Sequence, residues 1–450
     1  MKKEPYVALL DYLFKPKSIA LIGAAHTEEK LGGVILKNLL RFKGEVYPVN
    51  PKYTSIMGLK AYSSLADIPE SVDLSIIIRP ASEMPQILKE HKGRAECAII
   101  VSAGFAETGE NKLQDEIKSI AGEIGIRILG PNCMGVYNPY RGLDTFFLSR
   151  ERLKRPKKGN VAIVSQSGAI LSCLFGAMRT ENIGISKAVN YGNAADLNES
   201  DLYEYLADDE SSDVVISYIE SLSDGRRFIE TARVLSEKKS FIVLKSGKSS
   251  GGQAAAYSHT GRLAGRYDVF DSILRRFGIK EVMNFDELVD AAKAVSHQKP
   301  SNGKRVLIIT NGGGSGVLAA DECMRQGLDV AELPENRTRK LIQLFPHFYT
   351  INNPLDLTAQ VKDEDYVIAL NDLKNDYDGF IIIALTGVMG ITEKLGILMK
   401  NVKDSINKPI VFHIAHNGLS RRLIAILEKA GIPVYRSPER AVRGLRSLLN

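Results

Sequence analysis

Residues 160–168 read Asn160-Val161-Ala162-Ile163-Val164-Ser165-Gln166-Ser167-Gly168, an apolar run that ends in small polar residues. A run that stays apolar instead of alternating with polar residues is typical of a parallel strand buried on both faces. The residues that follow suit a turn into a helix, where free backbone N–H groups can bind an anion. The segment therefore predicts a strand–turn–helix unit of an α/β protein. Simple helix capping by Ser165 or Ser167 is an equal alternative to anion binding.

Two further segments repeat this pattern, one near the start of the chain and one in its last third. They read Ser18-Ile19-Ala20-Leu21-Ile22-Gly23-Ala24-Ala25 and Arg305-Val306-Leu307-Ile308-Ile309-Thr310-Asn311-Gly312-Gly313-Gly314-Ser315-Gly316. Apolar runs alternate with helical patterns around all three, which predicts an α/β fold of three Rossmann-like or flavodoxin-like doubly wound parallel-sheet domains in tandem. The expected limits are 1–138 for the first domain, 139–158 for a connector, 159–298 for the second domain and 303–450 for the third.

The expected strands are the apolar runs, and the polar stretches between domains are expected to be exposed. The basic connector, which includes Arg155, is interpreted as a solvated linker. Asn353–Thr358 is interpreted as a rigid turn in which Asp356 is a structural cap, with bracing of the glycine loop at 311–316 as the alternative. The strands are predicted at Ser18–Ile22, Glu45–Val49, Leu74–Ile78, Cys97–Val101, Arg127–Leu129, Val161–Ser165, Ile185–Val189, Val214–Ile219, Phe241–Leu244, Arg305–Thr310, Gly379–Leu385, Pro409–His413 and Pro433–Tyr435.

Composition excludes several classes of protein. The chain has 450 residues, of which 44% are hydrophobic and 25% charged, as in ordinary globular proteins. Its net charge of +6 is spread along the chain, which suits anionic metabolites and does not indicate nucleic-acid binding. No apolar window has the length of a membrane span and the start lacks a signal-type apolar core, so a cytoplasmic protein without membrane contact is expected. The four cysteines are far apart, without metal-binding spacing, so no metal site is expected.

The carboxyl ends of the first-domain strands are the expected ligand site, because doubly wound sheets bind ligands there. A strict GxGxxG motif is absent, and Asn50 stands where a nicotinamide-binding domain carries an acidic residue, which disfavours NAD. Lys30 before a glycine pair suits a phosphate-bearing ligand instead. The alternative is that these are turn residues of a generic α/β domain. The candidates are Gly23, Lys30, Gly33, Asn50, Lys52, Arg79, Ser102, Gly104 and Asn132.

A loop rich in glycine and serine, 247–261, follows the predicted strand Phe241–Leu244 and carries one imidazole, His259. A neutral imidazole is nucleophilic at physiological pH, although a lone loop histidine is more often a hydrogen-bonding or surface residue. Glu220 ends the neighbouring predicted strand and is expected at the same sheet edge, where its carboxylate can orient the imidazole. Pairing of Glu220 with Arg226 or Arg227 is an equal alternative.

A second anion cradle is predicted at Gly312, Gly313, Gly314, Ser315 and Gly316, a run of backbone N–H groups at a helix start. It lacks the lysine of a Walker A loop, so it is not an NTP-hydrolysing P-loop. A phosphohistidine formed at His259 would therefore need a nucleotide site elsewhere, most simply on another subunit.

Four motifs occur in order: Gly130-Pro131-Asn132-Cys133-Met134-Gly135, the segment at 161–168, Tyr257-Ser258-His259-Thr260-Gly261 and Asn353-Pro354-Leu355-Asp356-Leu357-Thr358. In this combination the whole chain resembles the α subunits of ADP-forming (NDP-forming) acyl-CoA synthetases such as acetate–CoA ligase, which are related to the succinyl-CoA synthetase α subunit. The resemblance implies the reaction acyl-CoA + ADP + phosphate ⇌ carboxylate + CoA + ATP, through an acyl phosphate and a phosphohistidine.

The same resemblance assigns roles to the candidate residues. It implies that His259 is the nucleophile and Glu220 its orienting carboxylate. It implies that the nine first-domain candidates contact CoA or shape its pocket, and that phosphate is held by Ser165, Gln166, Ser167 and Gly168 together with Gly312–Gly316. ADP or ATP with Mg²⁺ would be bound mainly by a separate β subunit with an ATP-grasp domain, in an α2β2 assembly. The acid itself, whether acetate or another short-chain, branched or aryl acid, is left open.

Two other classes of function remain as alternatives. One is a non-catalytic CoA-binding regulatory or scaffold protein of the same fold, against which the intact His259 loop argues. The other is a nicotinamide-dependent oxidoreductase, which the missing GxGxxG motif and Asn50 disfavour. Binding of CoA instead of NAD separates these two cofactor classes.

Overall fold

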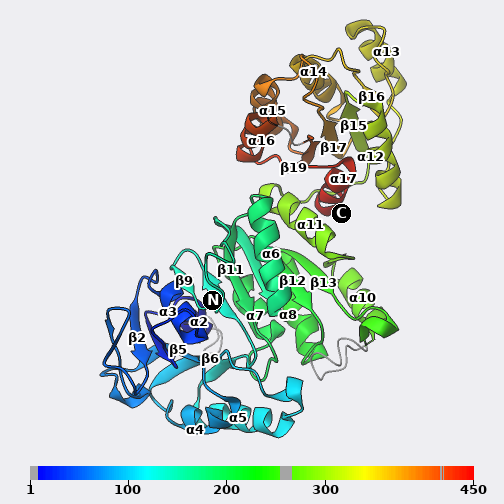
Figure 1. The fold of residues 1–450 in the computed structure, drawn as a ribbon. Helices are drawn as coiled ribbons and strands as arrows, with labels where there is room; N and C mark the ends of the chain where they lie inside the picture. Colours follow the sequence, from blue (N-terminus) through cyan, green and yellow to red (C-terminus); the bar gives the residue numbers. More distant parts are fainter. Residues whose placement is uncertain (1–8, 254–265, 416–417, 419, 450) are drawn as a thin grey trace. The chain divides into compact units, whose positions relative to one another are not determined.

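The computed structural model describes residues 9–253, 266–415, 418 and 420–449. The chain divides into two compact units, Met1–Met283 and Asn284–Asn450 (Figure 1). The first unit contains two parallel-stranded sheets and the second contains one, which confirms the predicted fold class. No helix in these described ranges is long and apolar enough to cross a membrane.

The first sheet has five parallel strands in the order β2-β1-β5-β6-β7. Three of the five predicted strands have the predicted bounds, and the other two are shifted by one or two residues. A two-stranded hairpin, β3–β4, lies outside this sheet. The strands are β1 (Ser18–Ile22), β2 (Glu45–Val49), β3 (Ser55–Ile56), β4 (Leu59–Lys60), β5 (Val72–Ile77), β6 (Ala95–Ile100) and β7 (Arg127–Leu129).

Helices cover both faces of the first sheet, which explains its continuous apolar strands. Ile99 and Ile100 of β6 are both fully buried, and they belong to separate hydrophobic clusters on opposite faces. Successive side chains of a strand point to opposite sides, so a strand sandwiched between helices must be apolar at every position. The covering helices are α2 (Leu10–Phe14) and α3 (Leu31–Leu39) on one face, and α4 (Met84–Lys89) and α5 (Asn111–Ile124) on the other.

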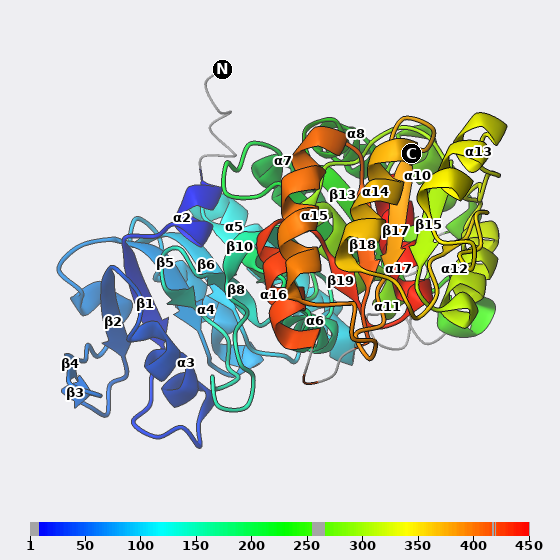
Figure 2. The ribbon, with the colours of Figure 1, turned by 90° about the horizontal axis from the view of Figure 1, so that it is seen from above.

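The second sheet has seven strands in the order β14-β13-β12-β10-β11-β8-β9. Five of them are parallel, and β8 and β9 extend the sheet as antiparallel strands. Figure 2 shows α6 on one side of this sheet and α7 and α8 on the other. The elements are β8 (Gly135–Asn138), β9 (Leu143–Asp144), β10 (Lys158–Ser165), α6 (Gly168–Thr180), β11 (Ile185–Asn190), α7 (Glu199–Ala207), β12 (Val214–Ile219), α8 (Gly225–Lys238), β13 (Ser240–Lys245), α10 (Tyr267–Arg276) and β14 (Lys280–Val282).

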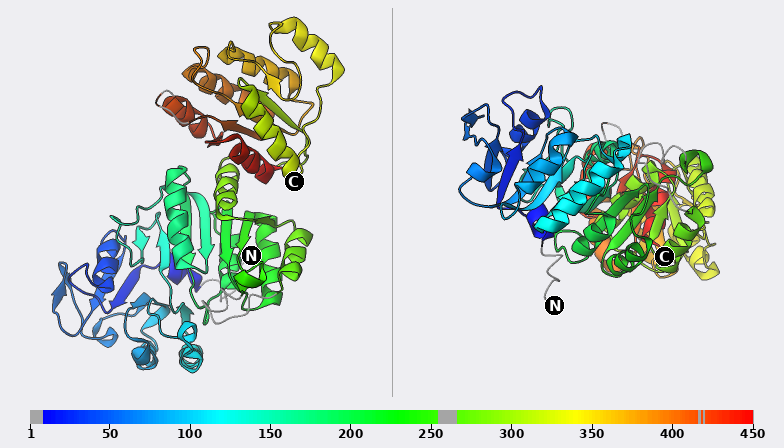
Figure 3. Two further views of the ribbon diagram at one scale, coloured as in Figure 1. Left: turned by 45° about the vertical axis from the view of Figure 1, so that its right-hand side comes forward. Right: turned by 90° about the horizontal axis from the view of Figure 1, so that it is seen from below.

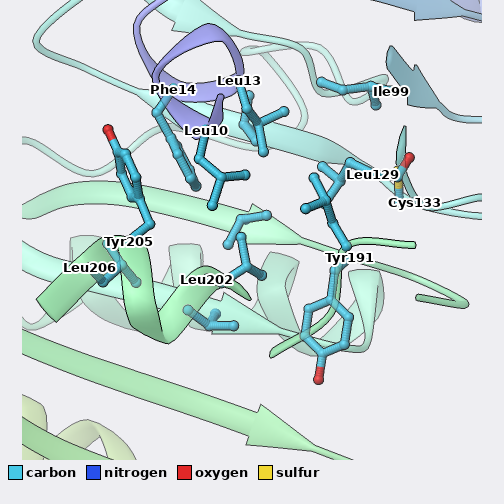
Figure 4. Close-up of a cluster of buried hydrophobic side chains, with 14 of the residues drawn as sticks. Leu10, Leu13, Phe14, Ile99, Leu129, Cys133, Tyr191, Leu202, Tyr205 and Leu206 are labelled. Carbon is cyan, nitrogen blue, oxygen red and sulfur yellow. The ribbon is translucent and has the colours of Figure 1, made fainter. Parts of the chain in front are cut away.

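The first two sheets share one hydrophobic core and lie side by side in the first unit (Figures 3 and 4). Phe14 of α2 stacks on Tyr205 of α7 with ring centroids 4.8 Å apart, and the Tyr205 hydroxyl donates to Asp11 at 2.9 Å. Arg127 of β7 forms a buried ion pair with Asp196, which follows β11, at 2.9 Å. These contacts join the first two sheets across their shared core.

The predicted solvated linker is wrong for Arg155, whereas its basic neighbours Arg152, Lys154, Lys157 and Lys158 are exposed as predicted. The Arg155 side chain is only 2% exposed, and its Nε lies 3.1 Å from Oδ2 of the fully buried Asp144. The guanidinium also donates to the carbonyl of Leu148 at 2.8 Å. A buried carboxylate needs a cation, so a basic residue that reads as exposed in sequence is drawn into the core.

The third sheet, in the second unit, has the order β16-β15-β17-β18-β19 and all its strands are parallel. In Figure 1, α12 and α17 lie on one side of it and α14, α15 and α16 on the other. Part of the predicted rigid turn is a strand, because Leu355 and Asp356 pair with β15. The strands are β15 (Val306–Thr310), β16 (Leu355–Asp356), β17 (Gly379–Ile383), β18 (Ile410–His413) and β19 (Val434–Tyr435).

Helix α11 belongs to the second unit, in which the carboxylate of Asp290 is held by Arg440 at 2.7 Å and Arg443 at 2.9 Å of α17. The division into two units does not test the domain limits drawn from the sequence, which stay a prediction. The helices of this unit are α11 (Phe285–His297), α12 (Gly313–Arg325), α13 (Glu335–Leu344), α14 (Asp363–Leu373), α15 (Glu393–Ile406), α16 (Ser420–Lys429) and α17 (Pro438–Leu448).

All three parallel sheets share one topology. In each, the parallel strands follow the order second, first, third, fourth, fifth, and in the second sheet β8 and β9 continue the sheet beyond the second of these strands, β11. The strand order reverses between the first and third strands, and ligands of such sheets bind at the carboxyl ends there. The three reversal points lie between β1 and β5, between β10 and β12, and between β15 and β17.

His91 is a fully buried histidine beside the first sheet. Its Nδ1 lies 2.8 Å from the carbonyl oxygen of Ile87 and its Nε2 lies 2.8 Å from Oγ of Ser75. A carbonyl only accepts, so the neutral ring carries its proton on Nδ1 and accepts from Ser75 at Nε2. Burial lowers the pKa of His91 from 6.5 to about 4.

Acidification is therefore expected to destabilise the chain through His91. The unfolded chain takes up a proton at this ring below pH 6.5, whereas the folded chain takes it up only near pH 4. The stabilisation is fully present above pH 6.5 and amounts to roughly 3 kcal/mol, lost as the pH falls toward 4. Urea unfolding at pH 7.5 and pH 4.5 measures it beside His91→Gln, which does not titrate. The variant should lose less stability on acidification than the wild type, and equal losses would contradict the prediction.

Candidate active site

Gln166 ties together the two loops at the reversal point of the second sheet. Its backbone N–H donates to the carbonyl of Tyr218 at 3.1 Å. Its side-chain Oε1 accepts from the amides of Glu220 at 2.9 Å and Ser221 at 3.0 Å, and its Nε2 donates to Ser221 Oγ at 3.1 Å. The loop after β10 and the loop after β12 are thus one hydrogen-bonded structure, and Glu220 is held beside the start of α6.

The start of α6 shows the helix cap that the sequence gives as one alternative, and it leaves the anion-binding alternative possible. Ser167 caps the helix, since its Oγ accepts from the amide of Ile170 at 3.3 Å, and Ser165 Oγ donates to the Ser167 carbonyl at 2.7 Å. The amides of Gly168 and Ala169 stand at the first two helical positions, where a helix offers no carbonyl partner. These two amides, together with the helix dipole, have the arrangement that suits an anion, and the Ser167 cap does not occupy them.

Asn190, at the end of β11, joins this loop to the loop that leaves the first sheet. Its Nδ2 donates to the carbonyls of Ser165 at 3.0 Å and Gln166 at 2.9 Å. Its Oδ1 accepts from the amide of Met134 at 2.7 Å. Met134 belongs to the loop 130–134, in which Asn132 has a left-handed backbone with φ 56°. One side chain therefore sets the distance between the two loops.

A cavity of about 550 Å³ lies where these loops meet. Segments of both sheets of the first unit contribute to its walls. Glu220, Gln166, Ser167 and Gly168 line it, together with Ser102 and Asn132 from the first sheet, so six of the predicted site residues share one space. The remaining lining residues are Leu31, Val101, Ala103, Cys133, Met134, Phe147, Leu148, Ala169, Ser172, Asn190, Gly192 and Asn193.

Two titratable groups face Glu220, whose own side chain is almost completely buried. Burial, with the Glu220 carboxylate, raises the pKa of Tyr218, while a hydrogen bond with Ser246 opposes the rise. Burial lowers the pKa of Lys245 to about 8, although the negative charges of Glu220 and Glu281 oppose the change. The Lys245 ammonium donates to the Glu220 carbonyl at 2.7 Å, so it secures the backbone that carries the carboxylate. Of the alternative partners, Arg227 contacts Asp201 at 2.9 Å and Glu204 at 3.0 Å.

The predicted nucleophile, His259, lies outside the described residues. On either side of the segment that carries His259, the chain contacts Glu281 of β14. Lys248 contacts Glu281 Oε1 at 2.7 Å, and the Tyr267 hydroxyl donates to Glu281 Oε2 at 3.0 Å. The preceding strand, β13, is parallel to β12, so the chain leaves β13 at the sheet edge that carries Glu220.

Cys133 lines the cavity but is not a candidate acyl acceptor. Burial raises the pKa of its thiol to about 12. Its Sγ donates to the carbonyls of Ile100 at 3.4 Å and Leu129 at 3.8 Å. Attack requires the thiolate, which is negligible at neutral pH with such a pKa, so Cys133 is a packing residue.

The other predicted CoA residues lie away from this cavity, around the carboxyl edge of the first sheet. Asn50 Nδ2 donates to the Ala24 carbonyl at 2.8 Å, and the backbone N–H of Gly104 donates to Oε1 of Glu107 at 2.6 Å. Arg79 forms an exposed ion pair with Glu83 at 2.6 Å. The remaining four are Gly23, which follows β1, Lys30 and Gly33 at the start of α3, and Lys52 in the turn after β2.

Gly23 and Gly33 have a structural role that explains them without a ligand. Gly23 has φ 94°, and a Cβ there would lie 2.4 Å from the Ile78 carbonyl oxygen. A Cβ on Gly33 would lie 1.9 Å from the carbonyl oxygen of Thr27. Both glycines allow the loop after β1 to pack on its neighbours, so they shape the reversal point of the first sheet.

Gly23→Ala is expected to destabilise the first unit by about 3 kcal/mol or more and to weaken CoA binding with it. Strain at positive φ costs about 1 kcal/mol, and the collision with rigid backbone adds to it. Gly125→Ala is the matched control, because Gly125 has φ 79° with nothing among the described atoms within 4 Å of its Cβ position. The control should lose only the stability that the backbone strain costs, about 1 kcal/mol. Thermal unfolding and CoA titration of both variants measure the difference, and equal losses would contradict the steric argument.

The third-sheet glycine loop is a separate structure in the second unit. The side chain of Asn311 forms two hydrogen bonds with the backbone of Leu385 in the opposite loop. Its Oδ1 accepts from the Leu385 amide at 2.8 Å, and its Nδ2 donates to the Leu385 carbonyl at 3.2 Å. Asn311 therefore joins two loops at the carboxyl edge of the third sheet, as Gln166 joins two loops at the carboxyl edge of the second. A Cβ at Gly312 would meet Leu385 at 2.5 Å, and one at Gly313 would meet Asp356 at 3.0 Å. Gly314 has no described atom within 4 Å of its Cβ position, so it is open to a ligand.

The sequence also indicates a small polar loop suited to a ligand at Asn190-Tyr191-Gly192-Asn193-Ala194, after the strand predicted at Ile185–Val189, and Asn190, Gly192 and Asn193 do line the cavity. Two residues were not among the sequence candidates: Met134, which lines the cavity, and Lys245, which donates to the Glu220 carbonyl. Met134 gave no comparable signal, because an apolar residue in a loop does not reveal which wall it forms.

Comparison with known proteins agrees with this arrangement. A CoA binding domain model matches residues 17–139, a succinyl-CoA ligase like flavodoxin domain matches 158–295, and a ligase-CoA domain matches 306–443. The chain is 40% identical over 442 residues to the α subunit of acetate–CoA ligase [ADP-forming] II from Pyrococcus furiosus, covering 96% of this chain and 95% of that one.

A second sequence relative and a solved structure support the same family. The acetate–CoA ligase [ADP-forming] of Methanocaldococcus jannaschii is 39% identical over 98% of this chain, which spans 63% of that longer protein. A dinucleotide forming acetyl-coenzyme A synthetase 1 from Ca. Korarchaeum cryptofilum, solved with phosphate and ADP, superposes with a TM-score of 0.88 at 32% identity, covering 98% of this chain and 96% of that one. The chain belongs to the family of ADP-forming acetate–CoA ligase α subunits.

Proposed function

We propose that this chain is the α subunit of an ADP-forming acyl-CoA ligase that catalyses acyl-CoA + ADP + phosphate ⇌ carboxylate + CoA + ATP with a partner subunit. The observation that carries the proposal is the cavity in which Glu220, the first amides of α6 and the loops of the first sheet meet. An anion site and a carboxylate at one edge, beside a CoA-binding sheet, match the needs of this reaction. The family relationship supports it independently.

The first chemical step uses the start of α6. Phosphate bound by the amides of Gly168 and Ala169 attacks the thioester carbonyl carbon. The C–S bond breaks, the CoA thiolate leaves and an acyl phosphate forms. A helix N-terminus stabilises the negative charge of the phosphate without proton transfer, so the nucleophile stays ionised.

The second step uses His259 and Glu220. An imidazole nitrogen attacks phosphorus, the carboxylate leaves, and the phosphohistidine later passes its phosphoryl group to ADP. Glu220 accepts a hydrogen bond from the other ring nitrogen, which sets the tautomer and stabilises the positive charge of the modified ring. Ser165, Gln166 and Ser167 hold the phosphate loop in place, and Gly312–Gly316 are proposed to bind phosphate at another stage.

Coenzyme A is proposed to lie along the carboxyl edge of the first sheet. Lys30, Lys52 and Arg79 then meet its phosphates, while Ser102 and Asn132 lead its thiol into the cavity. Arg79 would exchange Glu83 for a phosphate. That exchange costs little, because an exposed ion pair contributes only about 0–1 kcal/mol.

The nucleotide is proposed to bind mainly to the partner subunit. The family resemblance assigns to that subunit an ATP-grasp domain and Mg²⁺, in an α2β2 assembly. The phosphohistidine then carries the phosphoryl group from the cavity of this chain to ADP held by its partner.

The acid is proposed to be a monocarboxylate with an uncharged tail. The described lining of the cavity contains one charged residue, Glu220, and no lysine, arginine or histidine. The second carboxylate of a dicarboxylic acid would be buried there beside another negative charge. Burying an unpaired charge costs several kcal/mol, so such acids would bind poorly.

The test is phosphorylation of the purified chain, mixed with its candidate partner subunit, by ATP labelled at the γ-phosphate. A label that is acid-labile and base-stable is expected, and acetate with CoA should discharge it. No label, with a partner shown to bind ATP, would overturn the ligase mechanism and favour the non-catalytic CoA-binding protein.

A further inference from the structure

We infer that Met134 sets the size of the acyl group that the enzyme accepts. The inference rests on the proposed ligase function and goes beyond it, because it names the side chain that discriminates among acids. Met134 is 3% exposed and belongs to the cavity wall.

The backbone of Met134 is held on both sides. Its amide donates to Asn190 Oδ1 at 2.7 Å, and its carbonyl accepts from Thr145 Oγ1 at 3.3 Å. Both partners are themselves buried. The position from which the Met134 side chain starts is therefore fixed, and the side chain alone determines how much space remains in front of it.

The Met134 side chain covers the first residue of α6. A Cβ on Gly168 would lie 3.1 Å from both Cγ and Sδ of Met134. The Ser172 hydroxyl, one turn further along α6, lies 3.7 Å from the same sulfur. The thioether thus rests directly against the helix start whose amides are the anion site.

This contact places Met134 against the reacting group. In an acyl phosphate the acyl carbon is joined to phosphorus through one oxygen, so an acyl group whose phosphate is bound at Gly168 and Ala169 begins within contact distance of the first turn. Met134 is the apolar side chain that the structure puts there, and Phe147 and Leu148 line the same cavity. A flexible thioether adapts to acyl groups of different shapes but still occupies volume that a longer chain needs.

The experiment measures kcat/KM of the complex of the full chain with its partner subunit for acetate, butyrate and hexanoate. Met134→Ala removes three side-chain heavy atoms, and the ratio of hexanoate to acetate is expected to rise about 10-fold; Met134→Phe is expected to lower it about 10-fold. Met134→Leu, of similar size, should leave the ratio within about 3-fold of the wild type.

Met178→Ala is the matched control, because Met178 is a fully buried methionine of the same helix α6 that lies outside the cavity wall. It should lower kcat/KM for all three acids by one common factor. Suppose that the wild-type complex is active and that Met134→Ala and Met134→Phe each change kcat/KM by the same factor for all three acids. That result would overturn the inference and leave the ligase function intact. A wild-type complex inactive on every acid and unlabelled by ATP would overturn both.

Discussion

Replacing His259 by alanine is expected to abolish phosphoryl transfer from the γ-phosphate of ATP to this chain and to lower turnover by on the order of 10⁴-fold or more. The imidazole is the proposed covalent carrier between acyl phosphate and ADP, and no neighbouring side chain in the loop 247–261 is an equivalent nucleophile at neutral pH. Label incorporation and acyl-CoA synthesis by the complex measure the loss. CoA binding, measured by titration calorimetry, should stay within a factor of 3 of the wild type.

His347→Ala is the matched control, since His347 is exposed on the surface of the second unit. It should incorporate label as the wild type does. Glu220→Gln distinguishes the role of Glu220, which orients the imidazole, from that of His259, which carries the phosphoryl group. This variant should still be labelled, but about 10- to 100-fold more slowly. Full labelling of His259→Ala would remove the phosphohistidine mechanism, and an unchanged rate in Glu220→Gln would remove only the role of Glu220.

Asn190→Asp is expected to cost about 3 kcal/mol or more of stability and to lower activity at least 100-fold, although it changes one atom. The Asn190 amide donates to the carbonyls of Ser165 and Gln166 and accepts from the amide of Met134. An aspartate keeps only the last of these bonds. It sets a buried negative charge against two carbonyl oxygens, so the loop that carries the proposed anion site must move.

The pH dependence makes this prediction specific. The repelling carbonyls and the burial raise the pKa of the introduced carboxyl, and the protonated form can donate to one carbonyl again. The stability gap between Asn190→Asp and the wild type should therefore narrow as the pH falls. Denaturant unfolding between pH 5 and pH 8 measures the gap. Asn401→Asp, on an exposed position of α15, is the control and should show no gap. A gap that does not change with pH would contradict the assigned hydrogen bonds.

Many of the strands that the sequence predicts well share a physical property. β1, β2, β7 and β12 have the predicted bounds. β1 and β12 are largely apolar runs, whereas the edge strand β2 begins with the exposed Glu45. Parallel strands between two helical layers must be apolar on both faces, so such strands can be recognised from a continuous run of apolar residues. Together with the other predicted runs, of which those for β10, β15, β17, β18 and β19 are also strands, these four strands indicate the three sheets, the parallel direction and the position of Glu220 and Ser165–Gly168 at one sheet edge.

The strands that were missed are short and depend on distant partners. β9 and β16 have two residues each, and β14 has three. β8 pairs antiparallel with β11, so the chain passes from one sheet to the next within a few residues after β7. Segments this short carry no readable periodicity, and their conformation depends on hydrogen bonds to residues far away in the chain.

By itself, the sequence determined the α/β class, the family resemblance and the chemical types of the site residues, because these depend on local patterns and on motif order. Only the tertiary structure decided that Ser102, Asn132 and Met134 of one sheet share a cavity with Gln166 and Glu220 of the next. It also decided that Arg155 is buried and that Asn190 fixes the spacing of the two loops. The physical reason is that buried polar groups must find partners, and those partners are set by packing between segments that no local pattern connects.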